Sequence, residues 1–504
     1  MLLRPGADSD VCVEAGDQRY TRREIRALVA GTGAWLRGEG LAGGDRVLAL
    51  LDHDIRGVAF LAAASALGLR VMMPYNLGSA AVQEWAGIVT AAKPDWVADL
   101  KRDPSAADAL RGLGPRVVRP PWGGDPRAAA AAAGAEPLIE HPDPVGNFLV
   151  LFTSGTTGAP KAISISERLV CRRVASVSGK LGFHGQARIF MSGLLSNTTG
   201  VFFSFGAMLR GATLVFPANR DIEDWPAQVA RSRATHIMLR PVSMARFVAS
   251  AAASGADLSS VQCVAYGAAA MPRAVLEAGR RLMPCAWVLG YGLSETYGPF
   301  CWLDEEGHAQ GRYAAGAYCV GRPDETLEVR LAPVAGHRPG VGEVTVRGSA
   351  LMEGYLDVAT GGLTPPGEWL RTGDLAEWSP DGDLLLKGRV QATLLSANGH
   401  RVYPEEVEAV LITVPGVEEA LLVGANGDDA VMSRPVACLS GPLSHQDAAT
   451  IRAAVTRALG AVLSREKWPD LIYPSPGPFP KSANDKVLRA KVTAGIDDGA
   501  LIEL

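Results

Sequence analysis

Short apolar runs alternate with helix-like segments through the first half of the chain, and this alternation limits the possible folds more than any other feature. A helix is expected over Arg19–Gly38, where Thr21 provides a start signal, and a buried strand is expected at Asp45–Leu51. A helix over Gly57–Leu67 and a strand over Arg70–Pro74 come next. Strands that alternate with helices build mostly parallel sheets covered by helices, so the fold class is α/β. The alternation continues with expected strands at Phe148–Phe152, Thr213–Phe216, His236–Leu239, Val261–Tyr266 and Trp287–Tyr291, and with expected helices over Asp224–Arg233 and Pro272–Leu282.

Two segments depart from this pattern. In residues 103–143, proline, glycine and a run of alanines predict a surface connection with one helical turn. From Val341 to Arg389 the sequence changes to short β-like runs. The Asp381-Gly382 pair there is typical of a hairpin turn, with strands at Leu375–Ser379 and Asp383–Lys387 on either side.

At 504 residues the chain is too long for one ordinary core, so more than one domain is expected. We predict a large domain over residues 1–389 and a small α+β domain over residues 390–504, joined by a hinge. The expected elements of the small domain are strands at Gln391–Ser396, Val417–Gly424 and Val436–Leu439, and helices over Pro404–Val414 and Gln446–Leu463.

The charge balance indicates a small-molecule partner. With 49 basic and 53 acidic residues, the net charge of -4 provides no basic field that would attract nucleic acid or an anionic membrane. The first residues, MLLRPGADSD, do not resemble a signal peptide, and a cytoplasmic protein is expected. The cysteines form no CxxC pair, which argues against a disulfide framework and against a structural zinc site; they are Cys12, Cys171, Cys263, Cys285, Cys301, Cys319 and Cys438.

A loop rich in glycine and hydroxyl groups follows the apolar strand at Phe148–Phe152. Glycines let backbone amides approach phosphate oxygens, while hydroxyls and a terminal lysine add donors and positive charge. The loop does not match the Walker A pattern, because Lys161 is followed by Ala162 and the spacing differs. A plain flexible loop is the alternative. The candidate phosphate-binding residues are Thr153, Ser154, Gly155, Thr156, Thr157, Gly158 and Lys161.

This loop resembles the phosphate-binding loop of the adenylate-forming superfamily, which includes acyl-CoA synthetases, adenylation domains of peptide synthetases and firefly luciferase. Four other segments match the superfamily in order, over nearly the whole chain. They are Gly290–Thr296, Leu370–Leu375, Lys387–Arg389 and Pro480–Arg489.

The resemblance assigns the segment Gly290–Thr296 to the nucleotide. It implies that Tyr291 lies against adenine, that Ser294 contacts the α-phosphate and that Glu295 binds Mg²⁺, a cation that prefers oxygen ligands. A core aromatic and a solvated charge are the ordinary alternatives for Tyr291 and Glu295. The strand end upstream is expected to lie against adenine and the acyl group; the residues implied at this edge are Gly267, Ala268, Ala269 and Gly292.

The other matching segments supply the ribose contacts and a catalytic cation. Asp374 is expected in a tight turn suited to accepting hydrogen bonds from the ribose hydroxyls, and Arg389 is implied to reach ribose or phosphate. Lys486 matches the catalytic lysine of the superfamily, whose ammonium would neutralise charge on the phosphoryl oxygens. Surface turns and a solvated tail lysine are the alternatives.

The sequence departs from the superfamily at the hinge and around the acyl pocket. Gln391 replaces the usual hinge residue, and Asp485 replaces the glycine that commonly precedes the lysine. Asn197 or Ser196 takes the place of a histidine or aromatic found in many relatives. No acidic residue occurs from Asn197 to Arg220, which disfavours a simple α-amino acid as substrate. The candidate substrate-binding residues are Asn197, Thr199, Gly267 and Gly292, and the possible walls of the pocket are Met191, Phe202, Phe203, Met238 and Met271.

The resemblance implies an AMP-forming ligase that uses ATP and Mg²⁺ to convert an aryl, cinnamoyl-like or aliphatic acid into an acyl-AMP. The expected acceptors are coenzyme A first, a carrier protein second, and an amine or another small nucleophile third. A non-catalytic adenylate-binding homologue is an alternative of another class, and a luciferase-type oxygenase is a third.

Overall fold

A computed structural model describes residues 8–74, 86, 88–90, 92–101, 105–121, 146–153, 161–269, 271–314, 318–392, 394–395, 401–425, 434–481 and 487–504. The chain divides into two compact units. Unit 1 comprises residues 1–268, 279–300 and 348–368, and unit 2 comprises residues 269–278, 301–347 and 369–504. Within the described ranges, no helix combines the length and the apolar character that crossing a membrane requires. The predicted domain boundary after Arg389 stays a prediction.

Unit 1 contains an eight-stranded sheet with the order β20-β19-β8-β7-β4-β3-β5-β6. The pairs from β7 through β4, β3 and β5 to β6 are parallel, while β7, β8, β19 and β20 pair antiparallel. The central strands are apolar on both faces and pack into a core that includes Leu48, Val97 and Val150. The strands are β3 (Arg46–Leu50), β4 (Arg70–Met73), β5 (Trp96–Asp99), β6 (Arg116–Val118), β7 (Leu149–Thr153), β8 (Lys161–Ile165), β19 (Gly354–Leu356) and β20 (Leu363–Thr364).

The second sheet is nine-stranded, and seven of its strands follow one another in unit 1 in the order β13-β12-β11-β9-β10-β1-β2. The pairs from β13 to β1 are parallel, and the β1–β2 hairpin closes the edge. The carboxyl ends of the parallel strands therefore meet at one edge. The strands are β1 (Val11–Ala15), β2 (Gln18–Thr21), β9 (Arg188–Phe190), β10 (Thr213–Phe216), β11 (His236–Leu239), β12 (Cys263–Gly267) and β13 (Ala286–Leu293).

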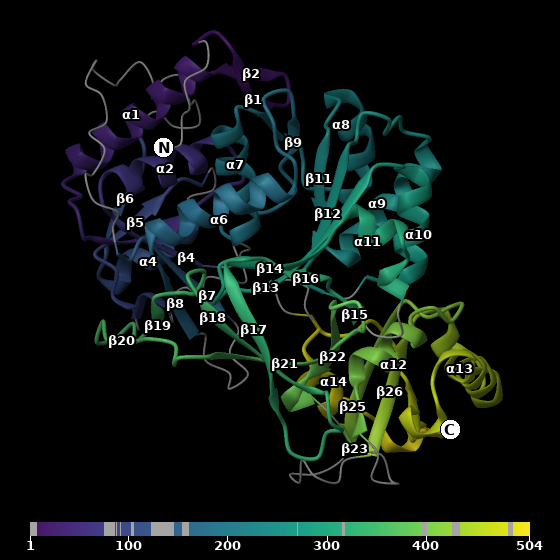
Figure 1. The fold of residues 1–504 in the computed structure, drawn as a ribbon. Helices are drawn as coiled ribbons and strands as arrows, with labels where there is room; N and C mark the ends of the chain where they lie inside the picture. The colour runs from purple at the N-terminus through teal and green to yellow at the C-terminus, as the bar shows by residue number, and fades with distance from the viewer. Residues whose placement is uncertain are drawn as a thin grey trace. The chain divides into compact units, whose positions relative to one another are not determined.

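Helices cover both sheets of unit 1, as predicted. The start signal at Thr21 is confirmed, because its side chain caps α1 (Arg22–Glu39) in a capping box with Glu24. Figure 1 shows α8 and α9 beside β11 and β12, and α7 packs against α2 and β10. The other helical segments are α2 (Ile55–Ala66), α4 (Ser105–Leu110), η2 (Arg111–Leu113), α6 (Glu167–Lys180), α7 (Thr198–Arg210), η3 (Ile222–Asp224), α8 (Trp225–Ser232), α9 (Pro241–Ser254) and α10 (Arg273–Leu282), which starts in unit 2.

Unit 2 holds a five-stranded sheet with the order β15-β22-β21-β18-β17. The predicted hairpin is confirmed: β21 (Leu370–Trp378) and β22 (Leu384–Arg389) pair antiparallel, and Gly382 in the turn adopts a φ of 83°. The strand β14 (Gly298–Leu303) runs from unit 1 into unit 2, where it pairs with β16 (Arg322–Pro323). The remaining elements here are α11 (Glu305–Ala309), η4 (Arg312–Ala314), β15 (Tyr318–Cys319), β17 (Leu327–Pro333) and β18 (Gly342–Gly348).

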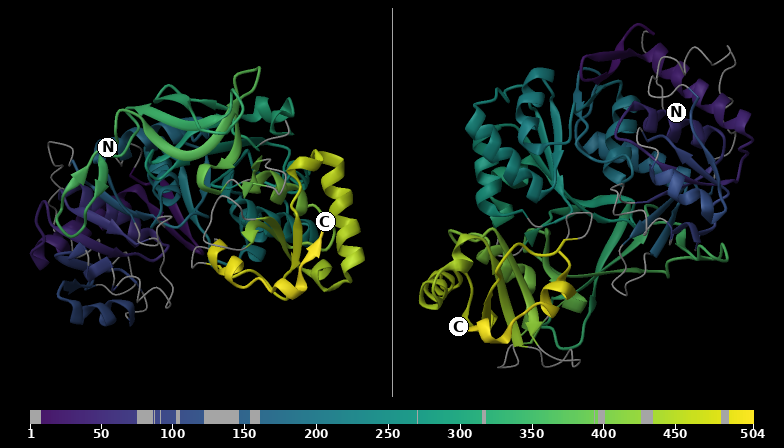
Figure 2. Two further views of the ribbon diagram at one scale, coloured as in Figure 1. Left: turned by 90° about the horizontal axis from the view of Figure 1, so that it is seen from below. Right: turned by 180° about the vertical axis from the view of Figure 1, so that it is seen from behind.

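The C-terminal part of unit 2 forms a four-stranded sheet with the order β25-β26-β27-β28. Two apolar clusters lie on this sheet, one of them shared with the helices α12 and α13. Figure 2 shows these helices and the strands of the sheet from two further sides. The elements are η5 (Val390–Ala392), β23 (Leu394–Leu395), β24 (Arg401–Val402), α12 (Pro404–Leu411), β25 (Glu419–Ala425), β26 (Arg434–Ser440), η6 (Pro442–His445), α13 (Ala448–Val462), η7 (Arg465–Lys467), β27 (Leu471–Pro474), α14 (Arg489–Ala494), η8 (Asp498–Ala500) and β28 (Ile502–Glu503).

Two sequence predictions are wrong. Residues 103–143 were expected to contain no strand, but Arg116–Val118 forms β6 at the edge of the eight-stranded sheet, where a short strand needs only β5 as its partner. The strand expected at Gln391–Ser396 begins instead as the 3₁₀ helix η5, and among the described residues of this segment Leu394 and Leu395 pair with β24. The exposed Gln391 pairs with no strand in the described part of the chain, and its backbone turns there.

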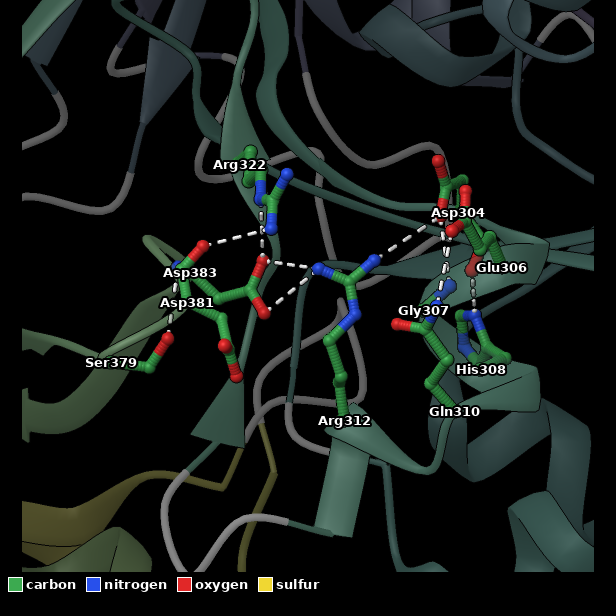
Figure 3. Close-up of polar contacts among 10 residues, drawn as sticks. All are labelled: Asp304, Glu306, Gly307, His308, Gln310, Arg312, Arg322, Ser379, Asp381 and Asp383. Atoms are coloured by element: carbon green, nitrogen blue, oxygen red, sulfur yellow. Dashed lines mark hydrogen bonds and ion pairs between the residues drawn. The ribbon is translucent and has the colours of Figure 1, made fainter.

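A buried carboxylate fastens the β21–β22 hairpin to the segment that precedes β15. Arg312 donates two hydrogen bonds to Asp383, at 2.7 and 2.9 Å, and the side chain of Asp383 is only 3% exposed. Arg322 donates a further bond to Asp383 at 3.3 Å and one to the carbonyl oxygen of Asp381 (Figure 3). Asp304 lies 3.7 Å from Arg312 on the other side. These contacts hold the hairpin that carries the predicted ribose-binding residues.

We expect Asp383→Asn to destabilise the protein by about 2 kcal/mol, because two guanidinium groups lose a charged acceptor in a buried place. The midpoint of thermal unfolding of the full chain measures the change. Asp381→Asn is the matched control, since the Asp381 side chain is exposed and only its carbonyl oxygen contacts Arg322. Equal midpoints for the two variants would contradict this account.

Candidate functional site

The carboxyl ends of β12 and β13 carry glycines without side chains, at the edge where the sequence predicts adenine and acyl contacts. Gly267 pairs with Gly290, and a side chain on Gly267 would place its first carbon 2.3 Å from the Gly290 carbonyl oxygen. A side chain on Gly292 would come within 2.1 Å of the Gly298 carbonyl oxygen. Only glycine fits at these two positions. The exposed Ala268 follows β12 with a φ of 67°, a conformation that turns the chain away from the sheet.

Tyr291 lies on β13 next to this glycine edge. Its ring is half-buried and tilted against Phe300 of β14, with a distance of 5.2 Å between ring centroids. Packing on one side fixes the ring while part of its surface stays exposed. This environment is compatible with the predicted stacking on a purine.

The predicted magnesium ligand, Glu295, lies in a tight turn between β13 and β14. The Tyr297 amide donates to the Ser294 carbonyl oxygen at 3.0 Å, which closes the turn around Glu295. The buried Thr296 hydroxyl accepts from the Leu293 amide at 3.0 Å and lies 2.7 Å from the Gly298 carbonyl oxygen. Tyr297 adopts a φ of 42°, which allows the chain to reverse in so few residues. The turn therefore presents Ser294 and Glu295 at the end of the sheet.

Tyr355 of β19 connects Glu295 to the end of the predicted phosphate loop. Its hydroxyl lies 3.2 Å from Oε1 of Glu295, and its ring centroid lies 5.4 Å from Nζ of Lys161. Burial and the neighbouring Glu295 carboxylate raise the pKa of Tyr355 to about 12, so the hydroxyl stays protonated and donates a hydrogen bond to the carboxylate. The amide of Met352 also donates to the Glu295 carbonyl oxygen, at 2.7 Å.

The phosphate loop itself is described only at its two ends. Thr153 of β7 pairs with Lys161 of β8 in the antiparallel ladder, so the loop starts and finishes at the same place in unit 1. The other predicted loop residues, Ser154, Gly155, Thr156, Thr157 and Gly158, lie outside the described residues. Unit 1 thus brings the base of the loop, Tyr355 and Glu295 together, and the sequence predicted all of these except Tyr355.

The predicted substrate residues at the start of α7 have clear local roles. The Asn197 side chain caps α7 by accepting from the Gly200 amide at 3.0 Å, and Thr199 lies in the first turn. Phe202 packs edge-on against Tyr297, with ring centroids 5.2 Å apart. Most of the predicted pocket walls belong to the buried core; these are Met191, Phe202, Phe203 and Met271, while Met238 is partly buried.

The predicted ribose residues lie together in unit 2. The tight turn expected at Asp374 is not observed, because Asp374 belongs to β21 and pairs directly with Arg389 on β22. The Arg389 guanidinium donates to Oδ1 of Asp374 at 2.5 Å and to the Thr372 carbonyl oxygen at 3.1 Å. Gly373 adopts a φ of 75°, and a side chain there would lie 3.5 Å from the Arg389 guanidinium. In the same unit, the Tyr318 hydroxyl donates to the carbonyl oxygen of Ala269 at 2.7 Å, which fixes the backbone after β12.

The predicted catalytic lysine, Lys486, and its neighbour Asp485 lie outside the described residues. The residues that flank them do belong to the described part of unit 2. Lys481 and Val487 form a β-bridge, and the Lys481 ammonium lies 2.7 Å from Glu419. The two residues that flank the segment with Lys486 are therefore paired with each other.

A family model described as AMP-binding enzyme matches residues 4–356, which is more than half of the chain. The chain belongs to the AMP-binding enzyme family. The match includes both ends of the phosphate loop, the glycine edge and the Glu295 turn, so the predicted resemblance is confirmed.

Curated relatives of this AMP-binding enzyme are named as acid–CoA ligases. A 4-coumarate--CoA ligase-like 3 from Oryza sativa subsp. japonica is 27% identical over 470 residues, which cover 85% of this chain and 77% of that protein. A peroxisomal OPC-8:0-CoA ligase 1 from Arabidopsis thaliana is 28% identical over 315 residues, which cover 60% of this chain and 57% of that protein. The chain thus spans little more than half the length of some of its relatives.

Solved structures of adenylate-forming enzymes share the fold of this AMP-binding enzyme, and the predicted α/β class is confirmed. An amide bond synthetase McbA from Marinactinospora thermotolerans is 26% identical with a TM-score of 0.80, covering 96% of this chain and 97% of that one. An anthranilate CoA ligase AuaEII in complex with anthranoyl-AMP has a TM-score of 0.82 at 21% identity, covering 98% and 95%. At that identity the second likeness concerns the fold alone.

The chemistry of unit 1 suits a nucleotide that arrives with a divalent cation. In the described part of the chain, no three side chains of the metal-binding types gather into one site. Mg²⁺ does not need such a cage, because one or two carboxylates together with phosphate oxygens and water usually bind it. The Glu295 carboxylate, held by Tyr355 beside the base of the phosphate loop, fits that requirement.

Proposed function

We propose that this enzyme activates a carboxylic acid with ATP and Mg²⁺ and then transfers the acyl group to a nucleophile. In the first step a carboxylate oxygen of the acid attacks the α-phosphorus of ATP. The bond between the α-phosphorus and its bridging oxygen breaks, pyrophosphate leaves, and an acyl-AMP mixed anhydride remains. Membership of the AMP-binding enzyme family and the names of the acid–CoA ligases among the relatives support this reaction.

The observation that carries the proposal is the arrangement of Lys161, Tyr355 and Glu295 next to the glycine edge of β12 and β13. Tyr355 contacts both the Lys161 ammonium at the base of the loop and the Glu295 carboxylate. Phosphate oxygens need positive charge and donors, whereas their counter-cation needs an anionic oxygen ligand. This arrangement supplies both.

The remaining roles follow the resemblance. Tyr291 would lie on adenine, Ser294 and the residues from Thr153 to Lys161 would contact the phosphates, and Asp374 with Arg389 would bind ribose. Mg²⁺ held by Glu295 would supply positive charge to the phosphate oxygens. Lys486 would neutralise charge that develops on the α-phosphate during the attack.

Coenzyme A is the acceptor that the relatives favour, because both plant proteins are named as CoA ligases. A specific observation favours a second candidate. The amide bond synthetase resembles this chain over 96% of its length at 26% identity, so an amine acceptor deserves the same test. A carrier-protein thiol is the third candidate acceptor.

The test is acid-dependent release of pyrophosphate from ATP and Mg²⁺, measured with a panel of aryl, cinnamoyl-like and aliphatic acids. We expect release with at least one class of acid and none without acid. Coenzyme A, amines and carrier proteins are then added in separate reactions, and mass spectrometry of the products identifies the acceptor. If the protein binds ATP but releases no pyrophosphate with any acid, it is a non-catalytic adenylate-binding homologue and the proposal fails.

A further inference from the structure

Two exposed arginines stand at the same edge of unit 1 as the predicted acyl site. The strands β9, β10, β11 and β12 are parallel neighbours, so their carboxyl ends meet. Arg240 follows β11 immediately, and because Leu239 pairs with Tyr266, Arg240 stands level with Gly267 on the adjacent strand. Arg220 follows β10 after a short connection, four residues beyond Phe216. Both guanidinium side chains are exposed at this edge.

Arg220 makes its contacts with neutral groups. It donates to the carbonyl oxygen of Ser192 at 3.4 Å, and its guanidinium lies 5.8 Å from the centre of the Trp225 ring. Within the described residues, no carboxylate forms an ion pair with Arg220. The surrounding protein and the positive charge of Arg240 lower the pKa of Arg220, which is what a cation without a nearby anion experiences. An anionic ligand would relieve both effects.

Two uncharged side chains, Ser192 and His53, connect this edge to the predicted wall residues Met191 and Met238. The Ser192 hydroxyl donates to the Met238 carbonyl oxygen, and His53 lies 2.6 Å from the Met191 carbonyl oxygen. Burial and the charge of Arg220 lower the pKa of His53 to about 4, so its ring is neutral near pH 7 and its Nε2–H donates to Met191. The imidazole therefore adds no charge of its own, and the arginines provide the positive charge at this edge.

We propose that Arg220 and Arg240 form a subsite for a second anionic group on the acid substrate. The favoured substrate is then an acid that carries a distal carboxylate in addition to the carboxylate that is activated. Guanidinium groups bind carboxylates through charge-assisted, often bidentate hydrogen bonds, which gives both affinity and orientation. This inference rests on the proposed adenylation, and it names the substrate class of the same site.

Phosphate groups of an acceptor such as coenzyme A share this chemistry. The position of the arginines favours the acid, because Arg240 is level with Gly267 and Arg220 contacts Ser192, which follows a predicted wall residue, Met191. The absence of acidic residues from Asn197 to Arg220 agrees with an anionic rather than a cationic substrate group.

The experiment compares a series of aromatic and aliphatic dicarboxylic acids with their monomethyl esters, in the pyrophosphate-release assay of the full chain. We expect the wild type to prefer the diacids by about tenfold or more in kcat/KM, the range that charge-assisted hydrogen bonds provide. Arg220→Gln and Arg240→Gln should each remove most of this preference and leave the rate with the esters unchanged. Arg231→Gln, an exposed arginine on α8, is the matched control and should change neither rate.

Calorimetric titration with the same diacids provides a measure of binding that needs no turnover. Binding that depends on Arg220 without any pyrophosphate release would support the subsite and contradict the proposed adenylation. The subsite is overturned if the arginine variants lose the same factor in kcat/KM with diacids as with esters. It is also overturned if the wild type shows no preference for diacids. If Arg220→Gln instead raises only the KM for coenzyme A, the arginines bind acceptor phosphates and the inference about the acid is wrong.

Discussion

The Glu295→Gln variant is expected to release pyrophosphate at least about a hundredfold more slowly than the wild type. The amide keeps the shape of the side chain and can still accept from the Tyr355 hydroxyl, 3.2 Å away in the wild type, so the turn should remain folded. What disappears is the negative charge that would hold Mg²⁺ against the phosphates. A metal ion stabilises the charge of a phosphoryl transition state by several kcal/mol, and each 1.4 kcal/mol corresponds to about tenfold in rate.

The control for this variant is Tyr355→Phe, which removes one hydrogen bond to Glu295 and leaves the carboxylate in place. We expect a loss of less than about tenfold, in line with a single hydrogen bond to a charged group. A magnesium titration separates the two effects, because only Glu295→Gln should require a higher Mg²⁺ concentration for half-maximal rate. Full activity of Glu295→Gln at low Mg²⁺ would remove Glu295 from the proposed metal site.

The sequence predicted the strand framework well because local signals and burial agree there. The apolar runs at Thr213–Phe216 and His236–Leu239 are strands with the same bounds in the structure. A short apolar run is typical of a strand in a buried parallel sheet, so the local sequence is enough to predict it. Thr21 forms a capping box with Glu24, a signal contained within four residues. The glycines at the ends of β12 and β13 were placed by resemblance, and their crowded backbone contacts supply a physical reason for them.

The contacts that complete the candidate site could not be predicted, because they join residues far apart in the chain. Tyr355 reaches Glu295 across 60 positions, and nothing in the short run around Gly354 signals this contact. Arg220 and Arg240 follow two different strands, and only the strand order places them at one edge. The sequence also did not predict the 3₁₀ turn at Gln391. A strand forms only where a neighbouring strand pairs with it, and the sequence around Gln391 does not show where the pairing with β24 begins.

The second large effect concerns Glu405 in unit 2, a carboxylate held against the chain that carries the predicted ribose residues. A side chain on Gly388 would come within 2.3 Å of Oε2 of Glu405, and this oxygen is buried without a hydrogen-bond partner among the described residues. Burial and the charges of Glu408 and Asp374 raise the pKa of Glu405 from 4.5 to about 7, although Arg489 and a backbone amide act in the opposite direction. The folded protein therefore binds a proton that the unfolded chain releases at lower pH.

A carboxyl whose pKa is raised by folding stabilises the folded state most below its unfolded pKa, and this contribution is lost as the pH rises through the folded value. Stability should thus fall between pH 5 and pH 8, and at pH 8 Glu405→Gln should be more stable than the wild type by about 2 kcal/mol. Thermal unfolding of the full chain at both pH values measures this as a higher midpoint for the variant at pH 8 only. Glu418→Gln, an exposed glutamate that follows α12, is the matched control and should leave the pH dependence unchanged. If Glu405→Gln and wild type lose stability equally between the two pH values, Glu405 takes up no proton on folding, because the amide cannot titrate.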